Sequence, residues 1–226
     1  MSILSLPVLS RRNATTASLS LLSNTQTFES PLNKTVQTYE LPGAKWQFSA
    51  TWENLLDADY FKLKAFILKC RGMAGRFYAG DLTHKNPLGR VNRGGTVSGA
   101  GQYGRVLNAR WTPAALTIDN SFLTADMDSL TCDAEHEEFS DWFLPGDYIN
   151  VNGELKMVVD QSNIPASGAV TLLFEPALRG VPVDGSSVVV SYPQAVFRLD
   201  SDNIDKASKR DGFWSPVTIT GIEVFQ

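Results

Sequence analysis

The chain of 226 residues is long enough for one large domain or two small ones with buried cores. Hydrophobic residues make up 43% of it and charged residues 19%, which excludes general disorder, a coiled coil and a collagen-like fibre. The net charge of -4 does not indicate nucleic-acid binding by the whole chain, and two histidines and two cysteines limit catalysis and metal binding.

The first ten residues are mildly apolar, and the basic pair Arg11 and Arg12 follows them. A secretory signal needs the reverse order and a longer apolar stretch, so we expect no leader. No run of about 18 apolar residues occurs, so we expect no membrane insertion. Cys70 and Cys132 lie about 60 residues apart, which favours free thiols in a reducing cytosol.

Short strands are predicted over most of the first 60 residues. Residues 45–52 alternate between apolar, mostly aromatic, side chains and polar ones, which indicates a half-buried strand. Another strand is predicted at 36–41, with a turn at Pro42-Gly43 between the two. Alternation of apolar residues with serine marks 17–21 as a third, so this part is expected to form an antiparallel sheet.

A helix is predicted at residues 57–71. Asp57 is placed to cap its start and Gly72 to end it. Basic side chains in the last turns suit the helix dipole. The apolar stripe expected to pack on the sheet consists of Ala58, Phe61, Ala65 and Leu68.

The remaining strands are short and separated by turns. Residues 83–104 are rich in glycine, proline and basic side chains, as in a loop or a crossing between domains. The clearest hairpin signal is Asn152-Gly153, because both residues of this tight turn need a positive φ. Residues 121–141 look acidic and irregular, and a bulge is predicted at Gly221. Strands are predicted at 76–79, 106–111, 115–118, 147–151, 154–159, 170–174, 187–192, 195–199, 217–219 and 222–224.

These elements predict a mainly β protein with two parts. Residues 1–84 and 195–226 form one β-rich unit that contains the helix. Residues 85–194 form an inserted small β-barrel, because their strands are short and evenly interrupted.

The small net charge conceals a segregation of charge along the chain. Residues 62–110 carry ten basic side chains and one acidic one, about +9. Residues 111–205 carry three basic and sixteen acidic side chains, about -13. Unevenly divided solvated faces would explain this, as would complementary patches that steer neighbouring copies together. Nucleic-acid contact by the basic segment is a third reading, although it lacks the interleaved aromatic residues of a single-strand groove.

No motif predicts a catalytic, cofactor or metal site. Residues 99–104 match G-x-G-x-x-G, but no apolar strand precedes them and no helix follows. The acidic segment around His136 has no second histidine and no calcium-loop spacing. Ser98 does not lie in a nucleophile elbow, and neither His84 nor the cysteines have an evident partner. We therefore expect a protein that is not an enzyme and that holds no cofactor and no metal.

Seven side chains are candidates for surface contacts. Aromatic residues stack on sugars or anchor interfaces, and three of them belong to the middle segment, where the pattern constrains them least. The others are basic residues of the helix and of the segment after it. The candidates are Trp111, Trp142, Tyr148, Lys62, Lys69, Arg71 and Arg76.

The order of these features resembles that of the distal tail proteins of long-tailed (siphovirus-like) bacteriophages. The resemblance covers most of the chain through short motifs. They are the aromatic strand 46–52, the helix end 69–72, Gly75–Asp81, Asn86–Gly89, Leu144–Ile149, Phe197–Leu199 and Gly221–Phe225.

This resemblance implies a fold and a role. The outer unit would be a β-sandwich with one packed helix, and the insert would be an oligonucleotide/oligosaccharide-binding-like or galectin-like barrel. The protein would form a ring, usually of six copies, between the tail tube and the host-recognition tip of the virion, after assembly in the bacterial cytoplasm. Its partners would be its own copies, the tail-tube protein and tail-tip hub or fibre proteins, and DNA would pass through the lumen without specific binding.

Two other functions stay open from the residues. A carbohydrate-binding module would use the insert to hold host polysaccharide through Trp111, Trp142 or Tyr148. A tail-tube or head-tail connector subunit would polymerise or join other parts of the virion instead of closing a tail-tip ring.

Overall fold

The computed structural model describes residues 2–9, 14–89, 116–119, 129–134, 139–160, 162–164, 169–182, 188–203 and 207–225. The described chain is mainly β, with one α-helix and several sheets, which confirms the predicted fold class at this level. The chain divides into two compact units. Unit 1 comprises Met1–Thr83 and Gln194–Gln226, and unit 2 comprises His84–Pro193. No helix of the described residues is long and apolar enough to cross a membrane.

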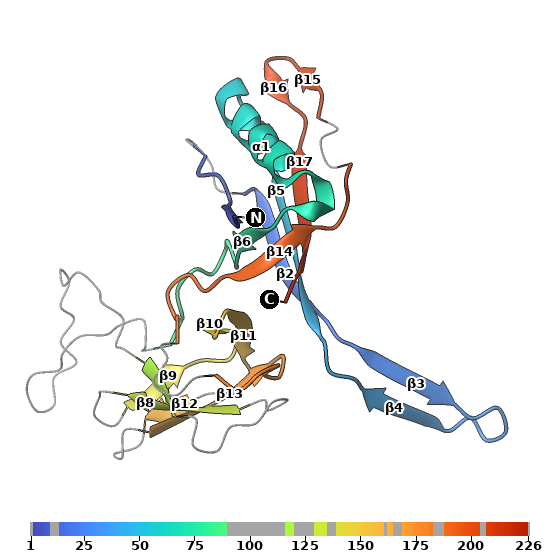
Figure 1. Cartoon of the computed structure of the whole chain (residues 1–226), viewed down its shortest axis with the longest axis vertical. Coiled ribbons are helices and arrows are strands. Elements are labelled where there is room, and N and C mark those ends of the chain that lie inside the picture. The colour runs from blue at the N-terminus through green and yellow to red at the C-terminus, as the bar shows by residue number, and fades with distance from the viewer. Residues whose placement is uncertain are drawn as a thin grey trace, which may run out of the picture. The chain divides into compact units, whose positions relative to one another are not determined.

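Unit 1 contains a six-stranded sheet in the order β1-β6-β14-β17-β5-β2 (Figure 1). β1 and β6 run parallel, and the other neighbours are antiparallel. The strands predicted at 45–52 and 195–199 are confirmed. The six strands are β1 (Leu4–Ser5), β2 (Thr16–Leu22), β5 (Lys45–Trp52), β6 (Phe77–Ala79), β14 (Ala195–Leu199) and β17 (Val217–Glu223).

The core of unit 1 lies between this sheet and helix α1 (Asp57–Cys70), which a short 3₁₀ helix η1 (Gly72–Ala74) follows. The alternation of β5 buries Trp46, Phe48, Ala50 and Trp52, as predicted. The Phe66 ring of α1 meets Phe77 of β6 edge to face at 5.5 Å between centroids, and Phe77 also contacts Phe197. Each fully buried aromatic or leucine side chain contributes about 1.5–3 kcal/mol to folding.

The helix turns a different face to the core from the predicted one. Its buried side chains include Tyr60, Leu63 and Phe66, whereas Phe61 and Leu68 are 55% and 65% exposed. Ala58 and Ala65 are exposed with them, so the predicted packing stripe was wrong. The helix has apolar residues on two faces. The buried face contacts residues from distant parts of the chain, because Tyr60 stacks on Trp214 and Phe66 contacts Phe77.

The predicted helix cap was also wrong. The residue before the helix is Leu56, in extended conformation, and Asp57 is the first helical residue. At the other end Arg71 adopts a left-handed conformation with φ 50° and donates its N–H to the Leu68 carbonyl oxygen. Gly72 follows with φ 67°, so the predicted helix end is correct to within two residues.

Two further hairpins belong to unit 1. Strands β3 (Thr25–Glu29) and β4 (Val36–Glu40) pair only with each other among the described strands, and Figure 1 shows them projecting beyond β2 and β5. The strand at 36–41 is thus confirmed, but it is not part of the main sheet as predicted. The second hairpin, β15 (Lys209–Arg210) and β16 (Phe213–Trp214), turns at Asp211 and Gly212 with positive φ.

Unit 2 contains a five-stranded sheet in the order β10-β11-β13-β8-β7 and a pair formed by β9 and β12. The Asn152-Gly153 hairpin is confirmed, with φ of 52° and 84° at the two turn residues. The strands are β7 (Leu116–Asp119), β8 (Ser129–Ala134), β9 (Phe139–Phe143), β10 (Tyr148–Val151), β11 (Glu154–Val158), β12 (Ser162–Ile164) and β13 (Ala169–Glu175).

Three predictions for the middle segment have different outcomes. The segment 121–141 is not irregular throughout, because β8 and the start of β9 lie within it. The strand expected at 187–192 is reduced to an isolated bridge between Val189 and Asn150 in the part that the structure describes. The strand predicted at 106–111 lies outside the described residues.

Gly221 lies at a closely packed position of β17. The bulge predicted there is absent, because β17 pairs with β5 in an unbroken register. A Cβ atom at this position would lie 2.9 Å from both the Arg198 carbonyl oxygen and the Phe77 ring. The glycine therefore allows the strand to pack closely on the aromatic core.

We expect Gly221→Ala to destabilise unit 1 by about 1–3 kcal/mol, because an overpacked core forces its neighbours to shift. Urea unfolding followed by tryptophan fluorescence measures this. Gly180→Ala is the control, since a Cβ atom there would meet nothing within 4 Å. Equal unfolding midpoints for the two variants would contradict the packing role.

Candidate functional site

The basic candidate residues lie on the surface of unit 1. Lys62, Lys69, Arg71 and Arg76 are all exposed. Lys62 also forms an ion pair with Asp59, at 3.6 Å from Nζ to the carboxylate. Three of the four belong to α1 and its C-terminal end, so they border the exposed face of the helix.

Two of the places in unit 1 where apolar side chains are exposed are the outer face of α1 and the β3–β4 hairpin. We call Ala58, Phe61, Ala65 and Leu68 of α1 the helix stripe. We call β3, β4 and their connecting turn, residues 25–40, the arm. Every residue of the two arm strands is exposed, and Phe28, Leu32 and Tyr39 are 60%, 96% and 63% exposed.

The start of α1 is tied to the β15–β16 hairpin. Asp57 accepts hydrogen bonds from Lys209 Nζ at 2.7 and 2.8 Å and from Trp214 Nε1 at 2.8 Å. The Trp214 ring stacks on Tyr60, with centroids 3.7 Å apart. The bonds from Lys209 and then Trp214 lower the pKa of Asp57. Asp57 thus anchors a distant hairpin instead of capping its own helix.

This contact is expected to depend on pH. Because the folded-state pKa of Asp57 lies below 3.8, its stabilising effect is present above that value and is lost as the pH falls through the folded-state pKa. The indole N–H signal of Trp214 in NMR should shift over this acidic range. Asp57→Asn is the control and should abolish that shift, whereas an unchanged titration in the variant would contradict the assignment.

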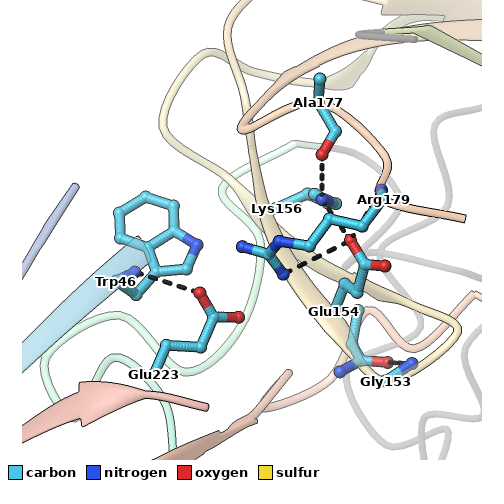
Figure 2. Close-up of polar contacts among 8 residues, drawn as sticks. Trp46, Gly153, Glu154, Lys156, Ala177, Arg179 and Glu223 are labelled. Carbon is cyan, nitrogen blue, oxygen red and sulfur yellow. Dashed lines mark hydrogen bonds and ion pairs between the residues drawn. The ribbon is translucent and has the colours of Figure 1, made fainter. Parts of the chain in front are cut away.

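Unit 2 holds an ion pair with a buried lysine, which Figure 2 shows in detail. Lys156 is completely buried, and its Nζ lies 2.7 Å from both Glu154 Oε2 and the Ala177 carbonyl oxygen. Arg179 Nη1 approaches the same Glu154 oxygen at 3.6 Å. The group ties β11 to the segment after β13, and the complete burial of Lys156 together with the partial burial of Glu154 and Arg179 makes it a structural feature.

A buried carboxylate lies at the end of the main sheet of unit 1. Glu223 at the end of β17 accepts a hydrogen bond of 3.1 Å from the Trp46 backbone N–H (Figure 2). The bond continues the β5–β17 ladder by one residue beyond the Gln47–Ile222 pair.

Asp147 organises the beginning of unit 2. Its fully buried carboxylate accepts hydrogen bonds from the backbone N–H groups of Leu88, Gly89 and Leu144 at 2.6, 3.1 and 2.9 Å. His84 Nε2 lies 3.9 Å from the same carboxylate, so this histidine does have a neighbour that the sequence did not indicate. The carboxylate holds the segment that enters unit 2 against the turn before β10.

The entering and leaving segments of unit 2 also contact each other. The Tyr192 N–H donates to the Lys85 carbonyl oxygen at 2.7 Å, and Ser191 Oγ donates to Asn86 Oδ1 at 3.2 Å. Lys85 Nζ lies 5.3 Å from the centre of the Tyr192 ring. These contacts hold the two ends of the insert side by side.

Of the three aromatic candidates, Tyr148 is the one whose side chain lies within the described part of the chain. Tyr148 lies on β10 and is half-buried. Trp142 belongs to β9, but its side chain lies outside the described residues. The whole of Trp111 also lies outside them. His136, Ser98 and residues 99–104 also lie outside the described residues.

Chemically reactive groups are few in the described part. Cys70 is a buried free thiol, and burial raises its pKa to about 11. No group of three or more His, Cys, Asp or Glu side chains among the described residues is placed to hold a metal ion.

Sequence reasoning missed the arm and the contacts of Asp147. The arm gives no local signal beyond two short strands, since exposure depends on what the rest of the chain covers. The β15–β16 hairpin, in contrast, does carry a signal, because Asp211-Gly212 is a favoured pair for a tight turn. Comparison of the chain with protein-family models and with curated proteins gave no match.

Proposed function

We propose that this protein is a structural component of a phage tail tip, whose copies form a closed ring of six that joins the tail tube to the host-recognition apparatus. In this proposal unit 1 is the ring-forming β-sandwich with its helix. Unit 2 is an outward barrel of oligonucleotide/oligosaccharide-binding-like or galectin-like type. The tail-tube protein and hub or fibre proteins are the partners, and DNA passes through the lumen without specific binding.

The arm is the observation that carries this proposal. An isolated two-stranded hairpin is marginally stable in water, and here both strands are exposed along their whole length. Phe28 and Tyr39 are more than half exposed on it, although aromatic side chains are the usual anchors of interfaces. An ordered projection with such side chains suits a protein that works in an assembly.

Light scattering tests the proposal directly. At micromolar concentration and moderate salt, the purified protein should have the mass of a ring-sized oligomer. A monomer under these conditions would overturn the proposal. Glycan binding by the intact monomer would instead support a carbohydrate-binding module.

A further inference from the structure

One face of the arm is aromatic and uncharged. In the arm register Phe28 lies opposite Gln37, and Gln26 lies opposite Tyr39. Since residues directly opposite each other share a face, these four side chains lie together. The other face carries Thr27 and, nearer the ends of the strands, Glu29 and Glu40. The aromatic face is therefore the side suited to an apolar partner.

The arm is ordered by its own hydrogen bonds before it meets a partner. At its tip the Ser30 N–H donates to the Thr35 carbonyl oxygen at 2.9 Å, and Asn33 Oδ1 accepts from Thr35 Oγ1 at 2.8 Å. At its base the Leu41 N–H donates to the Asn24 carbonyl oxygen at 2.8 Å. Such preorganisation lowers the entropy cost of binding.

The helix stripe matches the arm in length and character. From Ala58 to Leu68 it spans about 15 Å at the usual rise of a helix. A five-residue strand of the arm spans about 17 Å. The stripe alternates small and large side chains, so Ala65 leaves room between the larger side chains of Phe61 and Leu68.

The arm and the helix stripe have charges of opposite sign at their margins. Lys62, Lys69 and Arg71 border the stripe and are exposed. The arm carries a net charge of -1 from Glu29, Lys34 and Glu40, with Lys34 paired to Glu29 at 3.1 Å and Glu40 near its base. Complementary charge at the rim of an apolar contact favours correct encounter and register.

The two surfaces lie at opposite ends of β5 in the chain. The arm ends before Lys45, where β5 begins, and α1 starts after Trp52, where β5 ends. Both surfaces are exposed in the single chain, so the arm does not cover its own helix stripe. Two different complementary surfaces on one chain are what a heterologous contact between copies requires.

We infer that the aromatic face of the arm packs on the helix stripe of a neighbouring copy. This inference rests on the proposed ring, since it assigns the contact that joins adjacent subunits. In every incomplete assembly one arm and one helix stripe remain without a partner copy. Every arm and every helix stripe is occupied only when the assembly closes.

Cysteine cross-linking tests the contact in the full chain. A variant with both Phe28→Cys and Leu68→Cys is treated with a short bismaleimide in the assembled state, with the wild type as background for the native cysteines. Because every copy carries both halves of the contact, we expect a ladder of covalent species that ends at the mass of the ring.

Thr27→Cys combined with Leu68→Cys is the matched control. Thr27 neighbours Phe28 but lies on the opposite face of the arm, so its ladder should form several-fold more slowly. A ring by light scattering without a Phe28–Leu68 ladder, or with covalent dimers alone, overturns the inference and leaves the ring intact. Absence of any oligomer of the wild-type protein by light scattering overturns the inference together with the proposed function.

Discussion

Phe28→Asp is expected to dissociate the oligomer while leaving each chain folded. Phe28 is 60% exposed in the single chain, so a carboxylate there meets water in the monomer. In the assembly it would place a charge against an apolar surface. Truncation of an aromatic anchor typically costs about 2–4 kcal/mol of binding free energy. Since about 1.4 kcal/mol is a factor of ten, subunit affinity should fall roughly 30- to 1,000-fold. Light scattering over a dilution series measures the shift.

Thr27→Asp is the matched control for this prediction. It adds the same charge to the neighbouring exposed residue of β3, on the other face of the arm. Its oligomer should dissociate at nearly the wild-type concentration, and circular dichroism should show both variants folded. If both variants dissociate equally, general charge repulsion and not the aromatic face governs assembly.

Asp147→Ala is expected to unfold much of unit 2. The fully buried carboxylate accepts three backbone N–H groups, from Leu88, Gly89 and Leu144. The bond from Gly89 is buried and the other two are partly buried. A buried donor left without an acceptor costs about 1–3 kcal/mol, and a domain has only about 5–15 kcal/mol in total. Hydrogen exchange with mass spectrometry should show protection lost from peptides of 139–160. Protection in the main sheet of unit 1 should be retained, because the chain divides into two compact units and Asp147 belongs to unit 2.

Two substitutions separate this role from a general effect of removing charge. Asp147→Asn keeps one carbonyl oxygen and should be intermediate, because its amide group opposes one of the N–H donors. Asp211→Ala removes a carboxylate of the β15–β16 turn that is 89% exposed, and it should change protection in unit 2 little. Retention of wild-type protection by Asp147→Ala would show that the carboxylate does not hold this part of unit 2 together.

Local signals were enough to predict several strands. The alternation of 45–52 and the Asn152-Gly153 pair depend on neighbouring residues alone, and both predictions are confirmed. The helix face was wrong because its choice depends on Phe77 and Trp214, which come from other parts of the chain. Periodicity does not choose between two apolar faces of one helix. The face that was predicted to be buried is the one that stays exposed.

The candidate surfaces were predictable only in part. Lys62 and Lys69 are recognisable as surface residues because charged side chains are rarely buried, and both are exposed. Lys156 breaks that rule, because Glu154 and the Ala177 carbonyl oxygen meet its ammonium group inside the unit. The exposure of Phe28 and Tyr39 could not be predicted, since aromatic residues in a strand are typical of a core. What places them outside is that β3 and β4 pair only with each other among the described strands.

Electron microscopy of the purified wild-type protein tests the central claim, that copies of this chain close into a ring, most directly. The account predicts uniform closed rings with a central opening, in the same preparation whose mass is measured by light scattering. Single separate chains would contradict ring formation, and long cylinders would identify a tube subunit instead.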